Sequence, residues 1–170
     1  EVSVFTNCQE VELRLNGRVL GTAAPDRQMR ARFRVDYQPG ELVAVGRNGG
    51  VEAARDVLRT AGPPARLQLA VDASAPAPGS PAHVIVEVVD DKGVRVPGAA
   101  HQVAAAVDGP GRLLGLDNGD QTDPTPLRSP SRRARDGRLL AIVQSAPGPG
   151  PLCLRASDPG LPPAELVLRN

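Results

Sequence analysis

The densest group of potential ligand side chains follows the glycine-rich run that begins at Gly109. Asp117, Asn118, Asp120 and Asp123 could together supply oxygen atoms to a calcium ion, which takes about six to eight of them. Their spacing is not that of an EF-hand loop, and Asp-Asn-Gly-Asp is also typical of a tight turn whose side chains accept hydrogen bonds from nearby backbone amides. We therefore expect a turn without a bound metal, and keep Asp117 and Asp120 as weak candidates for metal ligands.

Two pairs of carboxylates lie elsewhere in the sequence. Hydrolysis of a glycosidic bond with retention needs two carboxyl groups about 5–5.5 Å apart in a pocket. Glu10 and Glu12 occupy alternate positions of one predicted strand, which places them on one face about 7 Å apart. Asp90 and Asp91 lie in a predicted turn, where aspartate is common. We expect a solvated strand face for the first pair and a turn for the second.

Histidine and serine side chains are not spaced for metal binding or nucleophilic catalysis. Neither histidine has a cysteine or a second histidine at a metal-ligand spacing, and no serine lies in the context of a nucleophile elbow. We expect structural or exposed positions, and no cofactor, for His83, His101, Ser129, Ser131 and Ser145.

Five arginines cluster around the predicted loop from residue 121 to 136. We expect a solvated loop, with contact to an acidic surface of a neighbouring domain as the alternative. A nucleic-acid partner is disfavoured, because the net charge is only +1 and no aromatic residues are interleaved for base stacking. The five are Arg128, Arg132, Arg133, Arg135 and Arg138.

Aromatic side chains, which commonly line ligand pockets and offer flat apolar faces to sugars, are scarce. The chain has no tryptophan, one tyrosine (Tyr37) and two phenylalanines (Phe5 and Phe33). Phe33 lies on the apolar face of its predicted strand, so we expect it in the core. An autonomous sugar-binding module therefore stays an alternative and not the main prediction.

Short β-strands must position all of these side chains. Glycine and proline each occur 18 times in 170 residues, so the elements must be short, and the small apolar residues suit strands. Several runs alternate apolar and polar residues, no 3.6-residue period is found, and no apolar run is long enough to cross a membrane. We predict an all-β protein of two consecutive immunoglobulin-like antiparallel β-sandwiches.

Residues 1–61 are predicted to form the first, smaller sandwich. Asn16-Gly17 is the strongest hairpin signal, because both residues tolerate a positive φ. In the run 29–35, Met29, Ala31, Phe33 and Val35 are expected to share the apolar face. Strands are predicted over 2–6, 11–15, 18–21, 29–35, 42–46 and 51–59.

Residues 62–65 are predicted to be a linker, because Gly62-Pro63-Pro64 favours a stiff extended connection. Residues 66–170 then form the second sandwich. Cys8 and Cys153 fall in different predicted domains, so we expect both thiols to be unpaired. Strands are predicted over 67–71, 84–89, 94–96, 101–107, 112–116, 138–144, 152–156 and 166–168, with a loop over 74–81 and a turn over 146–150.

Several motifs, in order along the chain, resemble a known family. Those of the first sandwich resemble the small β-domain that follows the catalytic barrel in bacterial β-galactosidases of glycoside hydrolase family 2. Those of the second are similar to the immunoglobulin-like C-terminal domain of the same enzymes. The motifs are Val4–Asn7, Glu10–Gly17, Leu20-Gly21, Pro39–Gly46 and Arg59–Gly62 in the first sandwich, and Gly109–Asp120 and Leu139–Ser145 in the second.

The resemblance implies a non-catalytic role. The family's two catalytic glutamates lie on a barrel that this sequence does not contain, so no catalytic residue is carried over. The implied partner is the catalytic barrel of the same parent chain, with contacts between subunits or with carbohydrate as further options. A carbohydrate-binding module and a cell-surface immunoglobulin-like spacer stay open as alternatives.

The resemblance has one visible departure. The family usually has an aromatic residue just before the turn that precedes the Leu139 strand, where this chain reads Arg133-Ala134-Arg135-Asp136-Gly137. Details of the 121–136 loop are therefore not carried over. Glu1 begins inside a strand pattern, so we expect a fragment of a longer bacterial protein, periplasmic or secreted, whose export signal would lie outside the fragment.

Overall fold

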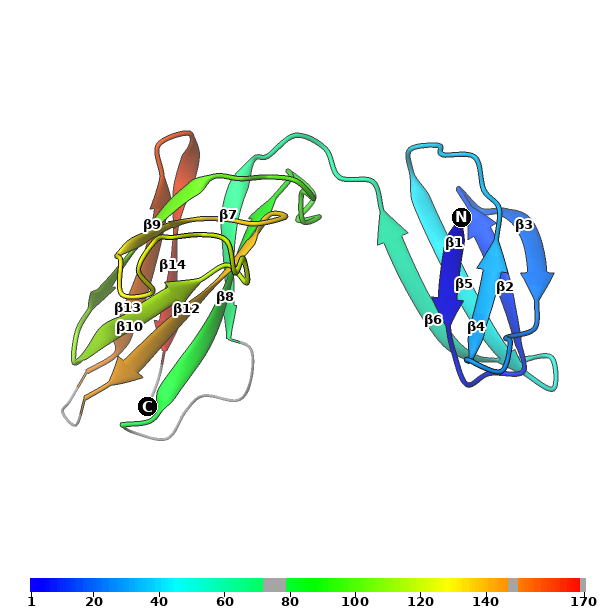
Figure 1. The fold of residues 1–170 in the computed structure, drawn as a ribbon, viewed down its shortest axis with the longest axis horizontal. Coiled ribbons are helices and arrows are strands. Elements are labelled where there is room, and N and C mark those ends of the chain that lie inside the picture. The colour runs from blue at the N-terminus through cyan, green and yellow to red at the C-terminus, as the bar shows by residue number, and fades with distance from the viewer. Residues whose placement is uncertain (72–78, 147–149, 169–170) are drawn as a thin grey trace. The chain divides into compact units, whose positions relative to one another are not determined.

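A computed structural model describes residues 1–71, 79–146 and 150–168, and these ranges contain strands and no helix (Figure 1). The predicted all-β class is confirmed. The chain divides into two compact units, Glu1–Thr60 and Ala61–Asn170, which are described separately below as unit 1 and unit 2. Much of the predicted 74–81 loop and the centre of the predicted 146–150 turn lie outside the described residues. None of the described elements is a helix able to cross a lipid bilayer.

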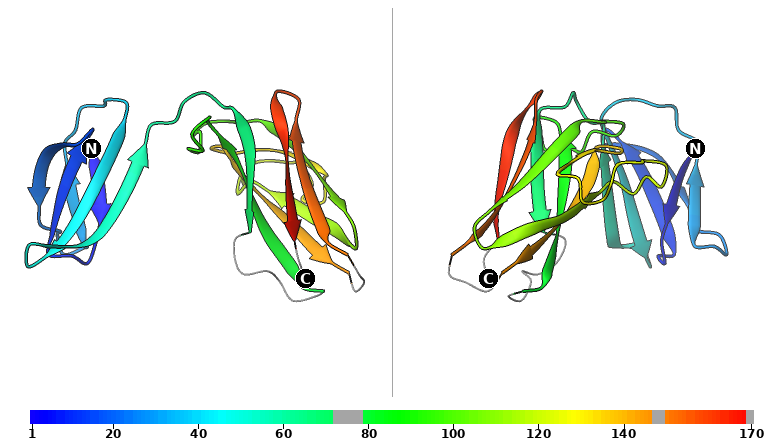
Figure 2. Two further views of the ribbon diagram at one scale, coloured as in Figure 1. Left: turned by 180° about the vertical axis from the view of Figure 1, so that it is seen from behind. Right: turned by 60° about the vertical axis from the view of Figure 1, so that its left-hand side comes forward.

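Unit 1 contains a four-stranded sheet and a separate two-stranded sheet. The order in the larger sheet is β3-β2-β5-β6, and the smaller sheet pairs β1 with β4. The right-hand view of Figure 2 shows β1 and β4 as a narrow layer of their own. The strands are β1 (Val2–Phe5), β2 (Glu10–Leu15), β3 (Arg18–Ala23), β4 (Arg30–Phe33), β5 (Glu41–Asn48) and β6 (Val51–Arg59).

The hairpin between β2 and β3 forms as the sequence predicts. Asn16 has φ 51° and Gly17 has φ 81°, the left-handed conformations that a two-residue turn of this type requires. Asn16 also fixes the neighbouring turn, because its side-chain oxygen accepts from the Glu41 N–H (2.8 Å) and its amide donates to the Pro39 carbonyl (3.1 Å). One side chain therefore joins two turns of unit 1.

The predicted strand over 29–35 is wrong at both ends. β4 covers only Arg30–Phe33, and Met29 has φ 57° and a largely exposed side chain. Asp26 closes this turn, since its carboxylate accepts from the N–H groups of Gln28 and Arg30. The left-handed turn at Met29 precedes the strand, so Met29 does not share the apolar face with Ala31.

Unit 2 is a sandwich of two four-stranded sheets. The orders are β10-β12-β8-β7 and β11-β9-β13-β14. β14 lies along β7 and β10 lies along β9, so the two sheets approach each other at both edges (Figure 2). The strands are β7 (Arg66–Val71), β8 (Pro81–Val89), β9 (Gln102–Asp108), β10 (Gly111–Asp117), β11 (Ser131–Arg133), β12 (Arg138–Ser145), β13 (Leu152–Asp158) and β14 (Leu161–Leu168).

The core of unit 2 lies between these sheets. Every second residue of β8 and of β12 is buried, as expected for strands with one face inward. Ala134 is also buried in this core, at the point where the resemblance leads one to expect an aromatic residue. The largest core side chains are Leu67, Val84, Val86, Val88, Val103, Leu116, Leu139, Val143, Leu152, Leu154 and Leu168.

Predictions for three segments of unit 2 need correction. The strand predicted over 166–168 is longer, because β14 begins at Leu161. The predicted strand over 94–96 is only an isolated bridge between Val89 and Arg95. The predicted loop over 121–136 contains β11, which pairs with β9 and so belongs to the sandwich. The rest of that loop folds against β10: the Leu116 N–H donates to the Leu127 carbonyl, and a Cβ on Gly115 would lie 2.7 Å from the same oxygen.

Candidate functional site

The acidic turn after β10 is held by bonds to its own backbone. Asp117 Oδ1 accepts from the Gly119 N–H, and Asn118 Oδ1 accepts from the Asp120 N–H, both at 2.9 Å. Asp120 Oδ1 accepts from the N–H and the hydroxyl of Thr122, at 2.9 and 2.7 Å. These are the side-chain-to-backbone bonds that Asp and Asn make in tight turns. Asp117 and Asp120 therefore serve the turn.

Asp123 belongs to a second cluster, which is centred on Arg132. Arg132 Nη1 donates to Asp123 Oδ2 (2.9 Å), and Arg132 Nη2 donates to the Thr125 carbonyl. The amide of Asn118 also donates to Asp123 Oδ2, at 2.8 Å. Arg132 is only 2% exposed. The expectation of a solvated loop is therefore wrong for this arginine, which anchors the loop beneath the surface.

The hydrogen bonds of this loop favour the ionised carboxylates. The Thr122 hydroxyl and N–H hold the pKa of Asp120 below its usual value, and the hydroxyl and N–H of Thr125 do the same for the pKa of Asp123. Arg135 and Arg132 reinforce these shifts by charge. Among the described residues, no group of three or more His, Cys, Asp or Glu side chains is placed to hold a metal ion.

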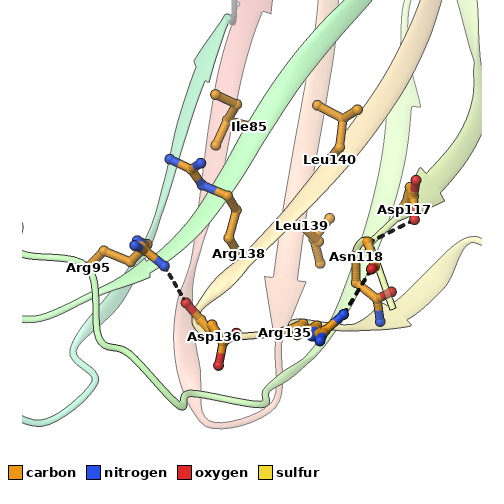
Figure 3. A pocket seen from close by; sticks show the side chains of 10 residues that line it. Ile85, Arg95, Asp117, Asn118, Arg135, Asp136, Arg138, Leu139 and Leu140 are labelled. Atoms are coloured by element: carbon orange, nitrogen blue, oxygen red, sulfur yellow. Dashed lines mark hydrogen bonds between the residues drawn. The ribbon is translucent and has the colours of Figure 1, made fainter. Parts of the chain in front are cut away.

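A hollow of about 500 Å³ opens beside this turn, on the outer face of the β10-β12-β8-β7 sheet (Figure 3). Ile85 and Leu140, neighbours on β8 and β12, supply apolar contacts. Arginines and turn residues surround them. The lining comprises Ile85, Arg95, Asp117, Asn118, Gly119, Arg135, Asp136, Arg138, Leu139 and Leu140.

The three guanidinium groups of the hollow already have acceptors. Arg95 donates to the Asp136 carbonyl at 2.7 Å and Arg135 to the Gly119 carbonyl at 2.9 Å, as the dashed lines in Figure 3 mark. Arg138 donates to Glu87, at 2.7 Å for the shortest contact. Among the described residues that line the hollow there is no histidine, cysteine, serine or lysine, and the carboxyl groups are those of Asp117 and Asp136. The hollow can offer hydrogen-bond donors beside an apolar surface, which suits contact with a polar ligand or a neighbouring surface better than acid–base chemistry.

Glu12 and Asp90, one residue from each of the two predicted carboxylate pairs, have different structural roles. Glu12 accepts from Arg14 Nε at 2.6 Å, on the face of the sheet where Arg47 also approaches it at 3.8 Å. Asp90 is buried, and its carboxylate accepts from the N–H groups of Gly62, Lys92 and Val94 at 2.8–3.0 Å. These bonds, the one from Gly62 foremost, lower the pKa of Asp90. Asp90 thus fixes the first residues of unit 2 to the turn after β8.

The remaining candidates also have structural surroundings. His101 Nδ1 lies 3.1 Å from Asp158 Oδ1, a carboxylate that also accepts from the Gly160 N–H. Ser145 is buried, and its hydroxyl accepts from the Gly79 N–H at 3.0 Å. The other candidates lie apart from these. His83 and Ser129 are elsewhere in unit 2, and Ser131 begins β11. Both cysteines are free thiols, Cys8 buried and Cys153 half-buried.

Sequence reasoning missed two features of unit 2. One is the burial of Arg132, which rests on bonds to the Thr125 carbonyl and to Asp123. The run Ser131-Arg132-Arg133 contains no apolar residue, so the sequence gives no sign of a strand there. The other is the hollow, which brings together residues from 85 to 140. Only the register of β8, β10 and β12 reveals that proximity.

Comparisons with known families agree with this architecture. The sequence profile described as glycoside hydrolase family 2 C-terminal domain 5 matches residues 71–167, more than half of the chain. A domain of unknown function (DUF4982) matches residues 1–54. The two matched ranges fall within unit 2 and unit 1, respectively.

Curated relatives are much longer than this chain. A β-galactosidase of Bacteroides ovatus (BoGH2A) is 33% identical over 167 residues, which is 96% of this chain and 20% of that protein. A β-galactosidase of Thermoanaerobacter pseudethanolicus is 30% identical over 174 residues, 91% of this chain and 22% of that protein. The chain thus spans about a fifth of the length of these relatives.

Solved structures give the same result. A β-glycosidase from Bacteroides vulgatus matches with a TM-score of 0.91 and 29% identity, over 99% of this chain and 22% of that chain. A glycosyl hydrolase family 2 member from Bacteroides cellulosilyticus matches with a TM-score of 0.87 and 29% identity, over 98% and 24% of the two chains. The strand arrangement described above recurs in both.

Proposed function

Because the chain belongs to the glycoside hydrolase family 2 C-terminal domain 5 family, we propose that it is a non-catalytic, structural part of a larger β-galactosidase-like enzyme. The active site of that enzyme would lie in polypeptide outside residues 1–170. The observation that carries the proposal is coverage: the chain aligns with about a fifth of relatives named as β-galactosidases.

The hydrogen bonding of three carboxylates of unit 2 agrees with this proposal. Retaining hydrolysis requires one carboxyl group to act as nucleophile and a second, about 5–5.5 Å away, to donate and remove the proton. In the described part of unit 2, Asp90, Asp120 and Asp123 have lowered pKa values and accept hydrogen bonds from backbone N–H groups. A carboxyl held ionised by such bonds is poorly suited to donate a proton to a leaving group near neutral pH.

The test is an activity measurement on two preparations. Purified residues 1–170 should release no phenol from aryl β-galactosides, whereas the full-length protein should do so with saturable kinetics. Removing residues 1–170 from the full-length protein should lower its stability or its solubility. Turnover by the pure 1–170 fragment would contradict the proposal. Loss of that turnover in a double variant, Asp117→Asn with Asp136→Asn, would place catalysis in the hollow.

Carbohydrate contact at the hollow is the second candidate. Arg95, Arg135 and Arg138 offer N–H donors beside Ile85 and Leu140, which is the mixture of polar and apolar surface that ligand sites use. Titration of residues 1–170 with galactosides and galactans, followed by amide NMR, tests it. Saturable shifts at Arg138 and Leu140 that disappear in Arg138→Ala would support it, and unchanged spectra at millimolar sugar would exclude it.

A further inference from the structure

The outer layer of unit 1 stops halfway across the four-stranded sheet. β4 lies beside β3, while on the other side a groove of about 270 Å³ separates β1 from the face of β5 and β6. The groove walls are mainly apolar. They comprise Val2, Ser3, Val4, Phe5, Leu13, Leu42, Ala44, Asp56 and Leu58.

Two large apolar side chains of this groove face solvent. Phe5 on β1 is 72% exposed and Leu58 on β6 is 62% exposed. A sheet with an apolar face is stable when another layer covers that face. Unit 1 has only 60 residues, a size at which folding buries only about 60% of the surface of the unfolded chain, so an uncovered strip is a substantial fraction of its core.

Among the described residues, β1 pairs only with β4, so its other backbone edge, beside the groove, has no strand partner there. Its residues Val2 to Phe5 pair with β4, and the Thr6 N–H continues this ladder to the Met29 carbonyl at 2.9 Å. Backbone groups alternate between the two sides of a strand. Since Thr6 and Val4 bond toward β4, the N–H and C=O groups of Ser3 and Phe5 point to the free edge.

We propose that a further β-strand, from polypeptide of the same protein outside residues 1–170, pairs with the free edge of β1 and fills this groove. Its alternate side chains would be apolar, packing on Leu42 and Leu58, and its backbone would bond to Ser3 and Phe5. Addition of a strand to an exposed sheet edge combines main-chain bonds with side-chain pockets.

The charge of the groove specifies one more property of the strand. The Asp56 carboxylate accepts from the N–H of the adjacent Val57, and within residues 1–60, all of which the structure describes, it has no ion-pair partner. A carboxylate covered by an incoming strand requires a cation or a hydrogen-bond donor. The strand therefore carries an arginine, a lysine or another donor opposite Asp56.

The length of the relatives favours the same protein as the source of the strand. The region matching this chain is 20% of the Bacteroides ovatus β-galactosidase, so four-fifths of such a protein is available to supply a strand of about five residues. The inference rests on the chain being part of a longer protein and is independent of which bond that protein hydrolyses. The alternative occupant is β1 of a second copy, which the experiment distinguishes.

Hydrogen exchange provides the primary test. The amides of Ser3 and Phe5 should exchange at least about a hundredfold more slowly in the full-length protein than in residues 1–170. The Val4 amide, which bonds to β4, serves as the internal reference in both. Equal exchange of Ser3 and Phe5 in the two proteins would overturn the proposal. Protection within residues 1–170 that rises with protein concentration would identify a second copy as the occupant and would also overturn it.

Two matched variants provide the second test. Leu58→Asp places a charge in the groove, and Val51→Asp places one at a similarly exposed position of β6 that does not line the groove. Each should change the melting temperature of residues 1–170 by no more than about 4 °C. In the full-length protein Leu58→Asp should restore fast exchange at Ser3 and Phe5, and Val51→Asp should not. Equal exchange rates of Ser3 and Phe5 in the two full-length variants would refute the proposed strand. Aryl-galactoside turnover, measured separately, reports on the proposed function alone.

Discussion

The two units differ in how completely one sheet covers the other. In the described residues of unit 2, eight strands form two four-stranded sheets that approach each other at both edges. The core between them contains leucines and valines from seven of these eight strands. Unit 1 opposes four strands with two and leaves Leu58 and Phe5 exposed beside a groove. Unit 2 thus has a complete core of its own, whereas the core of unit 1 is open on one side.

The polar side chains differ in the same way. Unit 2 buries Asp90 and Arg132 with hydrogen-bond partners, so its turns are fixed from within. In unit 1 the ion pairs lie on or near the surface, as for Arg59 with Glu41 and Arg55 with Glu52. Exposed pairs of this kind stabilise a fold little. We infer that unit 2 dominates the stability of the isolated chain and that unit 1 gains most from the rest of the protein.

The largest expected difference is between two core leucines. Leu154→Ala, in the closed core of unit 2, should lower the free energy of unfolding of that unit by about 4 kcal/mol, because the surrounding sheets cannot collapse into the cavity. Leu13→Ala, whose site borders the groove of unit 1, should cost about 2 kcal/mol. Urea unfolding followed through amide NMR signals of each unit measures both. Equal losses would show that the groove does not weaken unit 1.

The next largest effect concerns the buried arginine. Arg132→Met should lower the free energy of unfolding of unit 2 by about 2 kcal/mol, because Asp123 and the Thr125 carbonyl both lose a charged donor. Arg133→Met is the matched control, since this neighbour is exposed and should change stability by less than about 0.5 kcal/mol. The same urea experiment applies. Equal effects of the two substitutions would mean that the loop is not anchored through Arg132.

These two predictions also mark how far the sequence could lead. Alternation in β2, β8 and β12 indicated strands, and Asn16-Gly17 indicated a hairpin, because both signals are local. The Asp-Asn-Gly turn was predictable for the same reason. Arg132 was not, because its burial depends on Asp123 and Thr125 in a loop whose path is set by β11 pairing with β9. The groove was not predictable from the sequence either. Whether Leu58 is covered depends on a layer that residues 1–60 do not complete.

A smaller effect is expected at the turn junction of unit 1. Asn16→Ala should lower the free energy of unfolding of unit 1 by about 1–2 kcal/mol, because alanine disfavours φ 51° and cannot bond to Glu41 and Pro39. Asn16→Gly separates these causes, since glycine accepts the backbone angle but lacks the amide. Thermal melts of unit 1 signals provide the measurement. A loss for alanine no greater than for glycine would assign the whole effect to the hydrogen bonds.

The smallest effect is expected in the response of the two units to acid between pH 5 and pH 3. Asp90, Asp120 and Asp123 of unit 2 have folded-state pKa values below their ordinary value, which is near 3.9 in unfolded chains. Their stabilisation is therefore complete well above pH 4 and is lost as the pH falls through 3.9 toward the folded-state pKa values.

In unit 1 the pKa of Glu52 is likewise lowered, by the hydrogen bond from Arg55, but that pair is exposed and salt screens it. Unit 2 should thus lose more stability than unit 1 as the pH falls below about 4, and Asp90→Asn should reduce its slope against pH. Urea midpoints of each unit at pH 5.0, 4.0 and 3.0, in low and high salt, measure this effect. A steeper slope for unit 1 in high salt would show that its surface ion pairs contribute more than the hydrogen-bonded carboxylates of unit 2.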